Sequence, residues 1–394
     1  MRIGINCLTF DPLNVGGVTT YTLGLLRGLA AERGAHEIHI FIQPRYLSAL
    51  KNILNSHEIL IHSVRLPFAY STANRAYFSN SRTVTRLVNH FITRRLAAHL
   101  EETVDLLYTP TTILTVYELK IPQVLSMHDI QHVHFPDFFR WYQHIARGIR
   151  YELSARYANA IQASSQFSKE DFLNFFSFLT EDSVFVIPEG VDVATFAAPR
   201  NIKAIIEKYK LPNHFLFYPA QLWKHKNHLT VLRALRWLRD NSSLDIPLVI
   251  TGRRYHGSEE IFSYAESHCL DLYHLGNIPF DDLVTLFHAS YLLIQAGLHE
   301  SSSLPILEGC ACSTAVIAAR IPPIVEMAKT LDIELFSPTD PIDLAQQLAR
   351  LWKDDARRAE MIVNNREQII QFDWRVIARR YIKYFERIHI RHDT

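Results

Sequence analysis

Residues 215–221 read FLFYPAQ, and residues 222–235 read LWKHKNHLTVLRAL. The first segment is a short apolar run with the length of a buried strand, and the second has apolar residues at helical spacing after a basic turn. A strand that leads directly into a helix is the building unit of a parallel sheet. This stretch therefore predicts one strand and one helix of an α/β layer.

The same alternation continues in both directions along the chain. After this stretch, strands are expected at 247–252, 272–278, 291–297 and 315–320, and helices near 227–239, 259–267, 280–289 and 304–311. Before it, strands are expected at 2–6, 37–42, 105–110, 122–129, 160–165 and 184–190, and amphipathic helices at 19–33 and 142–158. We therefore predict two doubly wound α/β units, each with a parallel sheet that helices cover on both faces.

The chain has 394 residues, which is more than one ordinary hydrophobic core requires. A small-residue stretch that ends at Pro199 favours a boundary there, so we expect domains at 1–198 and 199–372. The last segment, 373–394, has the pattern of a helix. Its apolar stripe comprises Trp374, Ile377, Tyr381, Ile382 and Phe385. Because ligands bind at the carboxyl ends of parallel strands, the functional residues are expected in the loops that follow the strands.

The composition excludes several classes of protein. The formal net charge is +1, so no overall field points to nucleic acid or to an acidic partner. The 4 cysteines are scattered and form no disulfide framework, which favours a reducing compartment. The N-terminus lacks a long uncharged apolar run, so we expect a cytoplasmic protein with neither a signal peptide nor a membrane-spanning helix.

The region 65–95 is locally basic. Between Glu58 and Glu101 the sequence contains arginines and no acid, and aromatic residues lie among the arginines. The arginines are Arg65, Arg75, Arg82, Arg86, Arg94 and Arg95. A solvated helix face with a loop explains this pattern. A surface that faces an anionic membrane or a phosphate-bearing acceptor explains it as well, so peripheral membrane contact remains an open prediction.

The first strand is followed by Gly16 and Gly17, which directly precede a helix. Two glycines allow a ligand to approach the backbone closely, and the free amides of a helix start favour an anion. A plain turn explains the pair of glycines equally well.

The strand at 122–129 ends in His128 and Asp129, and His132 and His134 follow. Three histidines and an aspartate have the composition of a metal site. Pro136 and the neighbouring aromatic residues do not supply an obvious chelating loop, so we expect no metal. A structural role remains open for His132 and His134, whereas His128 at the strand tip is the better candidate for contact with a ligand hydroxyl.

In the second half, Lys224 and Lys226 stand just before a helix that begins near Asn227, a good N-cap residue. A lysine beside a helix N-terminus suits a diphosphate, although a solvated basic turn has the same appearance.

Residues 299–309, HESSSLPILEG, follow the strand at 291–297. The serines before Leu304 provide amides and hydroxyls at a helix start, which suit a phosphate. Glu300 and Glu308 are carboxylates in an otherwise apolar segment, and vicinal sugar hydroxyls are suitable partners for them.

Together these motifs resemble the family-4 retaining glycosyltransferases of the GT-B fold, also called group 1 glycosyl transferases. The matching segments are GGVTTY (16–21), HD (128–129), IPEGVD (187–192), YPAQLWKHKNH (218–228), LGNIPFDDL (275–283), HESSSLPILEG (299–309) and FDWRVIARRYIKYFERI (372–388). The resemblance implies two Rossmann-like domains facing each other across a cleft. The first domain would hold the acceptor and the second the nucleotide-sugar donor, and the terminal helix would cross back to the first.

The resemblance further implies transfer of a sugar from a nucleotide diphosphate sugar, with retention at the anomeric carbon and without a metal or other cofactor. The candidate catalytic residues are Glu300, His128 and Lys226. The candidate donor-binding residues are Gly17, Gln221, Lys224, Arg253, Ser302, Ser303, Leu304 and Glu308. The candidate acceptor-binding residues are Asp129 and His132. Lys226 is expected to neutralise the diphosphate, Glu308 to bind the ribose and Glu300 to bind the donor sugar.

One departure from the family pattern concerns the diphosphate. Relatives often have an arginine where this chain has Gln221, so Lys224 or Arg253 is a candidate replacement. The expected partners are a nucleotide-sugar donor, with mannose or another hexose, and a saccharide or lipid-linked acceptor, but no nucleic acid. Two alternatives remain, a nucleotide-sugar epimerase of the same architecture and a non-catalytic nucleotide-sugar-binding protein.

Overall fold

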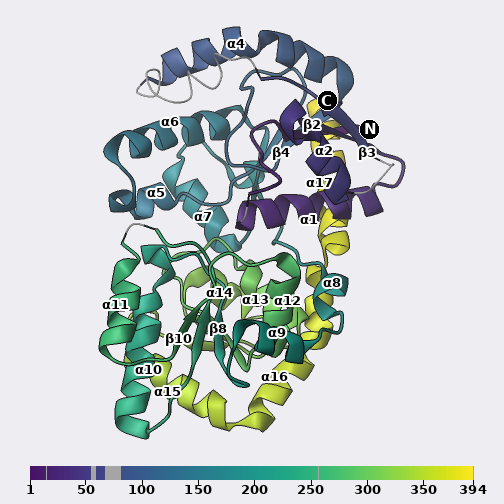
Figure 1. Ribbon diagram of the computed structural model, residues 1–394. Coiled ribbons are helices and arrows are strands. Elements are labelled where there is room, and N and C mark those ends of the chain that lie inside the picture. Colours follow the sequence, from purple (N-terminus) through teal and green to yellow (C-terminus); the bar gives the residue numbers. More distant parts are fainter. Residues whose placement is uncertain (15, 55–58, 67–80, 256, 394) are drawn as a thin grey trace. The chain divides into compact units, whose positions relative to one another are not determined.

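The computed structural model describes residues 1–394 apart from 15, 55–58, 67–80, 256 and 394. The chain divides into two compact units (Figure 1). Unit 1 comprises Met1–Gly190 and Trp374–Thr394, and unit 2 comprises Val191–Asp373. The first boundary thus lies before the expected position at 198.

Backbone and core contacts explain this earlier boundary. The helix α8 (Val193–Ala197) carries the buried Phe196, whose ring centroid lies 6.0 Å from that of Phe287 in the core of unit 2. The Val191 amide donates to the carbonyl of Phe372, with 2.9 Å between nitrogen and oxygen. The two chain crossings between the units are therefore tied to each other, and the small residues before Pro199 follow an element that already belongs to unit 2.

Unit 1 is built on a seven-stranded sheet in the part of the chain that the structure describes, with strand order β3-β2-β1-β4-β5-β6-β7 and parallel pairing throughout. The strands are β1 (Arg2–Cys7), β2 (Glu37–Ile42), β3 (Ile59–Ser63), β4 (Leu106–Thr109), β5 (Gln123–Ser126), β6 (Ala160–Ala163) and β7 (Val184–Val186). The order reverses between β1 and β4, which makes this pair the topological switch point.

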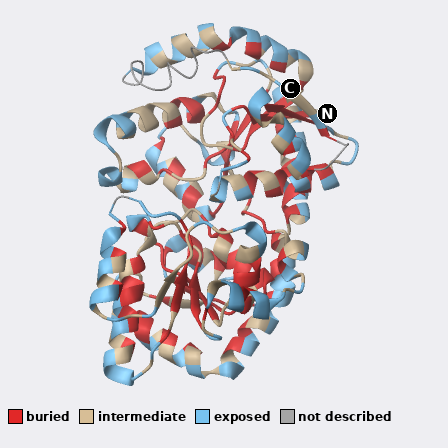
Figure 2. Cartoon of the chain, in the orientation of Figure 1, coloured by how far each residue is buried: buried red, intermediate tan, exposed pale blue. Residues whose placement is uncertain are grey.

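The helices of unit 1 are α1 (Gly17–Glu32), α2 (Leu47–Leu54), α4 (Arg82–Thr103), α5 (Gln131–His134), α6 (Trp141–Tyr157), α7 (Gln166–Phe175) and α17 (Trp374–Asp393). Short 3₁₀ turns occur at η1 (Pro44–Tyr46), η2 (Pro136–Phe138) and η3 (Glu181–Ser183). Apart from the edge strands β3 and β7, the strands are almost entirely buried, and the helices expose one face, as expected for a sheet between two helical layers (Figure 2).

The C-terminal helix α17 lies against α1 in unit 1 (Figure 1). Its apolar stripe is buried in the same core as β1 and β2, as the periodicity predicts. Close approach of the two helices depends on Gly24 and Gly28, because a Cβ atom at either position would overlap with Trp374. The small residues of α1 thus provide the groove that holds the start of α17.

A buried network of hydroxyl groups links α17 to the sheet. The Tyr21 hydroxyl on α1 lies 2.6 Å from that of Tyr381, 2.7 Å from that of Tyr108 and 2.8 Å from Ser126 Oγ. Ser126 donates to Gln162 Oε1 at 2.6 Å, and Gln162 Nε2 donates to the Ile187 carbonyl at the same distance. Because every member of this network has a partner, the network stabilises unit 1 and fixes how α17 docks.

Unit 2 contains a six-stranded sheet, counted over its described residues, with parallel strands in the order β10-β9-β8-β11-β12-β13. The strands are β8 (Leu216–Tyr218), β9 (Leu248–Ile250), β10 (Leu272–His274), β11 (Leu292–Gln295), β12 (Val316–Ala319) and β13 (Glu334–Phe336). The helices are α8, α9 (Ile202–Tyr209), α10 (His228–Ser242), α11 (Glu259–Ser267), α12 (Phe280–Ala289), α13 (Leu304–Ala311), α14 (Pro322–Met327), α15 (Pro341–Lys353) and α16 (Asp355–Gln368), with 3₁₀ turns η4 (Lys224–Lys226) and η5 (Ile369–Phe372).

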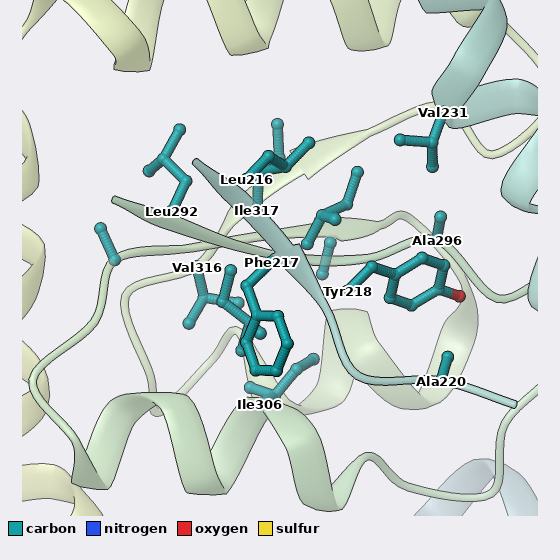
Figure 3. Packing of buried hydrophobic residues seen from close by; sticks show 14 of the residues in the cluster. Leu216, Phe217, Tyr218, Ala220, Val231, Leu292, Ala296, Ile306, Val316 and Ile317 are labelled. Atoms are coloured by element: carbon teal, nitrogen blue, oxygen red, sulfur yellow. The ribbon is translucent and has the colours of Figure 1, made fainter. Parts of the chain in front are cut away.

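The core of unit 2 anchors α13 to the middle of the sheet. Figure 3 shows Ile306 of α13 close to Phe217 of β8 and Val316 of β12. Ile306 and Leu307 are both buried, and each contributes roughly 2 kcal/mol of hydrophobic stabilisation. The apolar residues of the segment 299–309 therefore hold the helix in place, and the N-terminus of this helix lies just after the end of β11.

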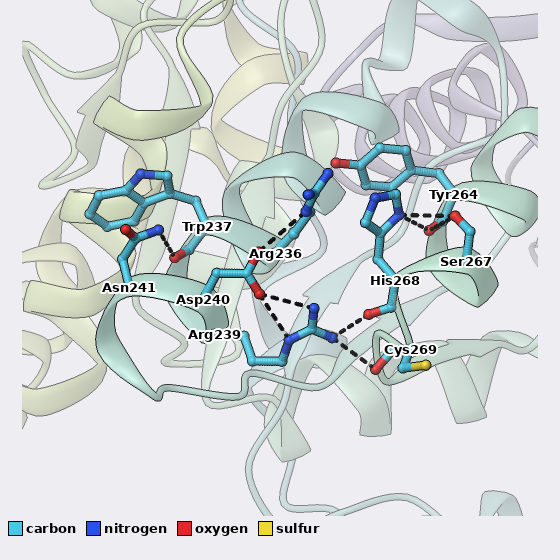
Figure 4. A network of polar contacts seen from close by, with 9 residues as sticks. All are labelled: Arg236, Trp237, Arg239, Asp240, Asn241, Tyr264, Ser267, His268 and Cys269. Carbon is cyan, nitrogen blue, oxygen red and sulfur yellow. Dashed lines mark hydrogen bonds and ion pairs between the residues drawn. The ribbon is translucent and has the colours of Figure 1, made fainter.

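A surface network joins the ends of α10 and α11 in the same unit (Figure 4). The Arg239 guanidinium pairs with Asp240 and donates to the carbonyls of His268 and Cys269. A cation near the last carbonyls of a helix is stabilising, so this network fixes the C-terminus of α11.

Two strands are not among the predicted elements, β3 and β13. Both are edge strands and short. Leu60 of β3 is exposed and Glu334 of β13 is a charged, partly buried residue, so the apolar signal of both strands is weak. The basic region 65–95 falls partly on 67–80, outside the described residues, and its later part forms α4. Among the described helices, none combines the length and the apolar composition that a membrane crossing needs.

Candidate functional site

The strand order of unit 2 reverses between β8 and β11, and ligands of open α/β sheets bind where such neighbouring strands end. The loop after β8 contains Lys226, and the loop after β11 contains Glu300 and leads into α13. The predicted donor residues therefore lie on two loops of this switch point.

Lys226 and Glu300 form the central contact of the site. Lys226 Nζ donates to Glu300 Oε1 at 2.6 Å, and the two side chains are only 17% and 12% exposed. At such low exposure, water screens the charges less than in a surface ion pair. The structure thus places a cation and a carboxylate together at the end of the sheet, as the sequence predicts.

Gly297 makes room for the carboxylate of Glu300. A Cβ atom at this position would lie within 3.0 Å of Glu300 Oε1, closer than real Cβ atoms approach an oxygen. Its next two neighbours would also be atoms of Glu300. The absence of a side chain at Gly297 is therefore a requirement of the ion pair rather than of the backbone turn.

Asn227 ties three strand-end loops together. Its backbone is left-handed (φ 60°), a conformation that asparagine tolerates better than most residues. Its Nδ2 donates to the carbonyls of Ala296 (3.2 Å) and Pro338 (2.8 Å), which follow β11 and β13. Asn227 occupies the N-cap position of α10, but its side chain does not cap that helix. The predicted capping role is thus wrong, and the amide instead holds the turn that carries Lys226.

Tyr218 also stabilises the turn that carries Lys226. It ends β8, and its hydroxyl donates to the carbonyl of Lys226 at 2.5 Å. Burial, followed by the charge of Glu300, raises the pKa of Tyr218 well above its ordinary value. The phenol therefore keeps its proton and remains a hydrogen-bond donor.

Two buried histidines flank Lys226 without adding charge. Burial, followed by the Lys226 ammonium, lowers the pKa of both His225 and His228 to about 3. The His225 carbonyl accepts from the Leu298 amide at 2.8 Å, a second link between the two loops. His228 packs on Tyr218 with 4.6 Å between ring centroids. Both imidazoles are neutral near pH 7, so Lys226 is the cation of this turn that lies beside Glu300.

The helix α13 begins at Leu304 with Pro305 in its first turn. Ser303 occupies the N-cap position but its side chain makes no capping hydrogen bond; its Oγ accepts from Gln295 Nε2 at 3.0 Å instead. Ser302, like Ser303 and Leu304, is buried. Ser303 therefore does not cap α13 with its side chain, and amides at a helix start carry a positive potential that favours a phosphate.

Glu308 lies one turn inside α13 and is 8% exposed. The serine segment directly precedes this short helix, so both predicted acids and the helix start lie on one segment of unit 2, residues 300–308.

Gln221 and Arg253, two further donor candidates, are neighbours. Gln221 Oε1 accepts from the backbone amide of Arg253 at 2.9 Å. The side chain of Arg253 is directed to Asn277, whose side-chain amide, oriented with its oxygen toward the guanidinium, accepts from Arg253 Nε at 2.7 Å. Lys224 is exposed on the same loop as Lys226. The guanidinium of Arg253 is thus engaged by Asn277, and Lys224 carries the second cation of the turn.

In unit 1, His128 follows β5 and lies near the switch point of its sheet. Its Nε2 lies 2.9 Å from the carbonyl oxygen of Pro110, and Tyr21 contacts the ring edge-on with 4.9 Å between centroids. A carbonyl only accepts, so Nε2 carries the proton and Nδ1 is the acceptor nitrogen. Burial lowers the pKa of His128, an effect that the hydrogen bond to Pro110 and the charge of Asp129 oppose.

The other predicted residues of this loop, Asp129 and His132, make contacts within unit 1 that stabilise its structure. Asp129 Oδ1 accepts from the Gln131 amide at 3.0 Å and starts α5. His132 is 1% exposed, and its ring contacts Tyr151 edge-on. Neither ring nitrogen of His132 has a hydrogen-bond partner, and burial lowers its pKa to about 4. His132 thus lies in the interior, where the structure does not support its predicted contact with an acceptor.

His134 pairs with Asp171 at 2.8 Å, which agrees with the structural role left open for it. Over the described residues, no cluster of three or more His, Cys, Asp or Glu side chains is arranged to hold a metal ion. Gly17 is exposed at the first turn of α1, where the amides of Thr19 and Thr20 both donate to the Gly16 carbonyl.

The structure thus brings Lys226, Glu300 and the start of α13 together within unit 2. Sequence reasoning missed Gly297, Tyr218 and the actual role of Asn227. The signal for Asn227 is its place after a basic turn, where a left-handed residue is common. No sequence pattern identifies the role of Tyr218, because its hydroxyl contacts the backbone of Lys226, and such a contact between a strand end and a loop leaves no pattern in the sequence.

Two family models match the chain. Residues 15–195 match the model of Glycosyltransferase Family 4, and residues 200–368 match that of the Glycosyl transferases group 1. The two matches follow one another along the chain. The first covers most of unit 1 and extends beyond Gly190 to residue 195, and the second lies within unit 2.

Curated relatives include mannosyltransferases. The serotype-specific mannosyltransferase WbdA of Escherichia coli is 27% identical over 239 residues, which cover 59% of this chain and 29% of WbdA. This chain thus spans less than a third of that relative's length. The O-antigen chain mannosyltransferase B of Escherichia coli is 20% identical over 366 residues, which cover 91% of this chain and 92% of the relative.

Solved structures share the fold over nearly the whole chain. Sucrose-phosphate synthase from Thermosynechococcus elongatus aligns with a TM-score of 0.75 at 16% identity and covers 99% of both chains. Anabaena Alr3699/HepE, crystallised with UDP-glucose, aligns with a TM-score of 0.72 at 18% identity, over 98% of this chain and 99% of HepE.

Proposed function

Because this chain belongs to the group 1 glycosyl transferases and has the GT-B fold, we propose that it transfers a sugar from a nucleotide diphosphate sugar to a saccharide or lipid-linked acceptor. The single observation that carries this proposal is the Lys226–Glu300 contact of 2.6 Å at the switch point of unit 2. A fixed cation there suits a diphosphate leaving group, and a fixed carboxylate suits the hydroxyls of the sugar that it carries.

Each group has one role in this proposal. Lys226 and the amides at the start of α13 stabilise the negative charge that develops on the departing diphosphate. Glu300 accepts hydrogen bonds from donor-sugar hydroxyls, and Glu308 accepts them from the ribose. Lys224 adds to the positive potential of the turn in place of the arginine that relatives have at the position of Gln221. No step requires a metal ion.

We further propose that the reaction retains the anomeric configuration. The acceptor hydroxyl attacks on the face from which the diphosphate leaves, and a diphosphate oxygen takes its proton. The new glycosidic bond forms as the bond to the diphosphate breaks, so one nucleotide diphosphate is released for each sugar transferred. His128, with Nδ1 as acceptor, is the candidate of unit 1 for contact with a substrate hydroxyl.

The test uses labelled GDP-mannose and UDP-glucose, with and without mannooligosaccharide or lipid-linked acceptors. Mannose is proposed because two relatives are named mannosyltransferases. Transfer should release free nucleotide only when acceptor is present, and NMR of the product should show the anomer of the donor. The chelator EDTA should leave the rate unchanged. An epimerised donor would identify an epimerase, and donor binding without turnover would identify a binding protein.

Glu300→Gln is the variant of choice for this test. It keeps the size of the side chain and a hydrogen bond to Lys226, so unit 2 should fold normally. Loss of the carboxylate is expected to lower kcat/KM by about 10²-fold or more. Unchanged turnover in this variant would show that Glu300 has no role in the reaction.

We also propose peripheral contact of unit 1 with an anionic membrane through α4. The outward side of this helix carries Val84, Leu87 and the 76% exposed Phe91 at helical spacing, next to the exposed Arg94 and Arg95. An apolar ridge beside arginines is typical of helices that lie in a bilayer interface. A solvated helix face would not need the ridge.

Sedimentation with vesicles tests this contact. The chain should bind vesicles that contain phosphatidylglycerol more strongly than vesicles of phosphatidylcholine alone, and salt should weaken this binding. Phe91→Glu should abolish the binding and leave transfer to a soluble oligosaccharide unchanged. Equal sedimentation of Phe91→Glu and the unaltered chain would contradict the proposal.

A further inference from the structure

The start of α6 in unit 1 exposes a group of large apolar side chains. Trp141 is 70% exposed, and Tyr142, Ile145 and Phe138 of the preceding turn η2 are exposed as well. Ile145 lies one helical turn after Trp141 and Tyr142, so these three side chains share one side of the helix. We call the four residues the α6 ridge. Single exposed apolar residues are ordinary, but a contiguous group of this size marks a binding surface.

The charges around the α6 ridge favour an anionic partner. Residues 138–151 contain three arginines and no acid, and one exposed acid, Asp137, precedes them. The exposed Arg140 donates to the Tyr142 hydroxyl at 3.3 Å, so a cation and a phenol border the apolar side chains. Tryptophan and tyrosine combine an apolar ring with one polar atom, which suits the interface between a bilayer and water, and arginines suit anionic headgroups.

The helices α6 and α4 lie beside each other on the same face of the sheet (Figure 1). Arg82 of α4 pairs with Glu152 of α6 at 2.7 Å. The helix α4 packs in one core cluster with Leu107 of β4, and α6 packs in another with Leu125 of β5. Leu125 pairs in register with Thr109, two residues after Leu107, so both leucines project from one face of the sheet. The outward sides of the two helices therefore face the same side of unit 1.

The α6 ridge is also tied to the loop that carries His128. This loop leads into α5, which continues through η2 into the start of α6. The buried His132 of α5 packs edge-on against Tyr151 of α6, with 4.9 Å between ring centroids. The loop after β5 and the start of α6 thus form one packed segment, and a contact made by the ridge places His128 relative to the contacted surface.

We propose that the α6 ridge inserts into the interface of an anionic bilayer and is a second anchor beside α4. This inference rests on the proposed function, because it adds an element to the membrane contact of α4 and assigns the acceptor to the lipid-linked class. Trp141 and Ile145 enter the boundary between headgroups and acyl chains, whereas Arg140 stays with the lipid phosphates. Stable attachment to a bilayer takes two signals, and two anchors on one side fix the orientation of unit 1. The loop of His128 is then held near the bilayer surface, where the saccharide of a lipid-linked acceptor begins.

Tryptophan fluorescence of the full chain tests the second anchor without requiring turnover. The probe is a vesicle of phosphatidylglycerol mixed with phosphatidylcholine that carries bromine near the start of its acyl chains. Bromine should quench part of the emission, and variants identify the source among the 5 tryptophans. Trp141→Phe, which keeps a ring at the ridge, should still sediment with the vesicles but lose the quenched part. Trp223→Phe alters an exposed tryptophan of unit 2 and is the matched control, which should keep the quenched part.

Sedimentation and kinetics separate this proposal from the function on which it rests. Trp141→Glu changes an exposed side chain, so its Tm should stay unchanged while its affinity for the vesicles falls about tenfold or more. Its KM for a lipid-linked acceptor in these vesicles should rise about tenfold, and transfer to a soluble oligosaccharide should stay unchanged.

Three results would overturn the second anchor. They are the absence of vesicle binding, equal sedimentation of Trp141→Glu and the unaltered chain, and vesicle binding in which bromine leaves the emission of Trp141 unquenched. Self-association that Trp141→Glu abolishes would assign the α6 ridge to a second copy of the chain and would also overturn it. Quenching of Trp141 in a chain that transfers no sugar would support the anchor and contradict the proposed reaction.

Discussion

Replacement of Gly297 by alanine probes the ion pair at the switch point of unit 2 without touching either charge. The new methyl group would overlap with Glu300 Oε1, and its next neighbours are the Cδ and Cγ atoms of the same side chain. The backbone of Gly297 is not in the left-handed region, so alanine is compatible with its conformation. The overlap is therefore relieved by rotation of one flexible side chain, which moves its carboxylate away from Lys226.

The size of the effect follows from this geometry. The carboxylate must retreat by about 1 Å to restore an ordinary contact with carbon. A displacement of about 1 Å at a reacting group costs up to 10²-fold in rate, which corresponds to about 2.7 kcal/mol in the activation free energy. Stability should change by less than about 1 kcal/mol, because a Gly-to-Ala replacement lowers the entropy of the unfolded chain and offsets part of the lost ion pair.

Two measurements on purified Gly297→Ala decide the matter. Thermal unfolding should give a Tm within about 4 °C of the unaltered chain, and kcat/KM for sugar transfer should fall by about 10²-fold. Combination with Glu300→Gln should add little further loss, since both changes act on the same contact. Full activity in a folded Gly297→Ala variant would refute the requirement for Glu300 beside Lys226.

Other perturbations give equally direct outcomes. His228 has a pKa lowered to about 3 and no hydrogen-bond partner on either ring nitrogen, so its imidazole stays neutral in the folded protein. The unfolded chain binds a proton at this residue more readily, so the unfolding free energy should fall as the pH drops below about 6.5. His228→Phe should make this fall smaller, which thermal unfolding at several pH values would show. Gly28→Ala places a methyl group against the Trp374 carbonyl and should lower the unfolding free energy, measured with urea, by about 1–3 kcal/mol. Gly148→Ala is the control, because its methyl group would meet no atom closer than 3.9 Å, and it should leave the unfolding free energy unchanged. Burial raises the pKa of Tyr21 to about 12, so the phenol stays protonated above pH 10 in the folded protein but ionises in the unfolded chain. The unfolding free energy should therefore decline from about pH 10 upward. Tyr21→Phe should reduce the slope of the unfolding free energy against pH in this range.

The fold was predictable because its signals are local. Alternating short apolar runs and helical patterns identify nearly every strand, and α11, α12 and α13 have the predicted bounds. The edge strands β3 and β13 were missed, since a strand with one open edge needs fewer apolar residues. The boundary near Pro199 was placed too late because the turn signal follows α8, whereas Phe196 on that helix packs into unit 2.

The candidate site was predictable only at residues whose type is typical of a chemical role, such as a charged residue at a strand end. Lys226 and Glu300 are charged residues at strand ends, and their contact follows from the order of the strands. His132 has the same kind of signal, yet it is buried against Tyr151, because α5 turns its side chain into the interior. Sequence patterns report that a polar residue lies near a strand end, but they do not report the direction of its side chain.

Asn227 shows why the supporting contacts are harder to predict than the charged pair. A glycine would satisfy the left-handed backbone at this position, but it would lose both hydrogen bonds to the carbonyls after β11 and β13. Those carbonyls are contributed by segments far apart in the sequence, and neither contains a residue with recognisable chemistry. The position of Lys226 thus depends on backbone groups near Ala296 and Pro338 as much as on its own loop. It follows that the loop after β13, which carries no candidate functional residue, is part of the machinery that holds the cation against the carboxylate.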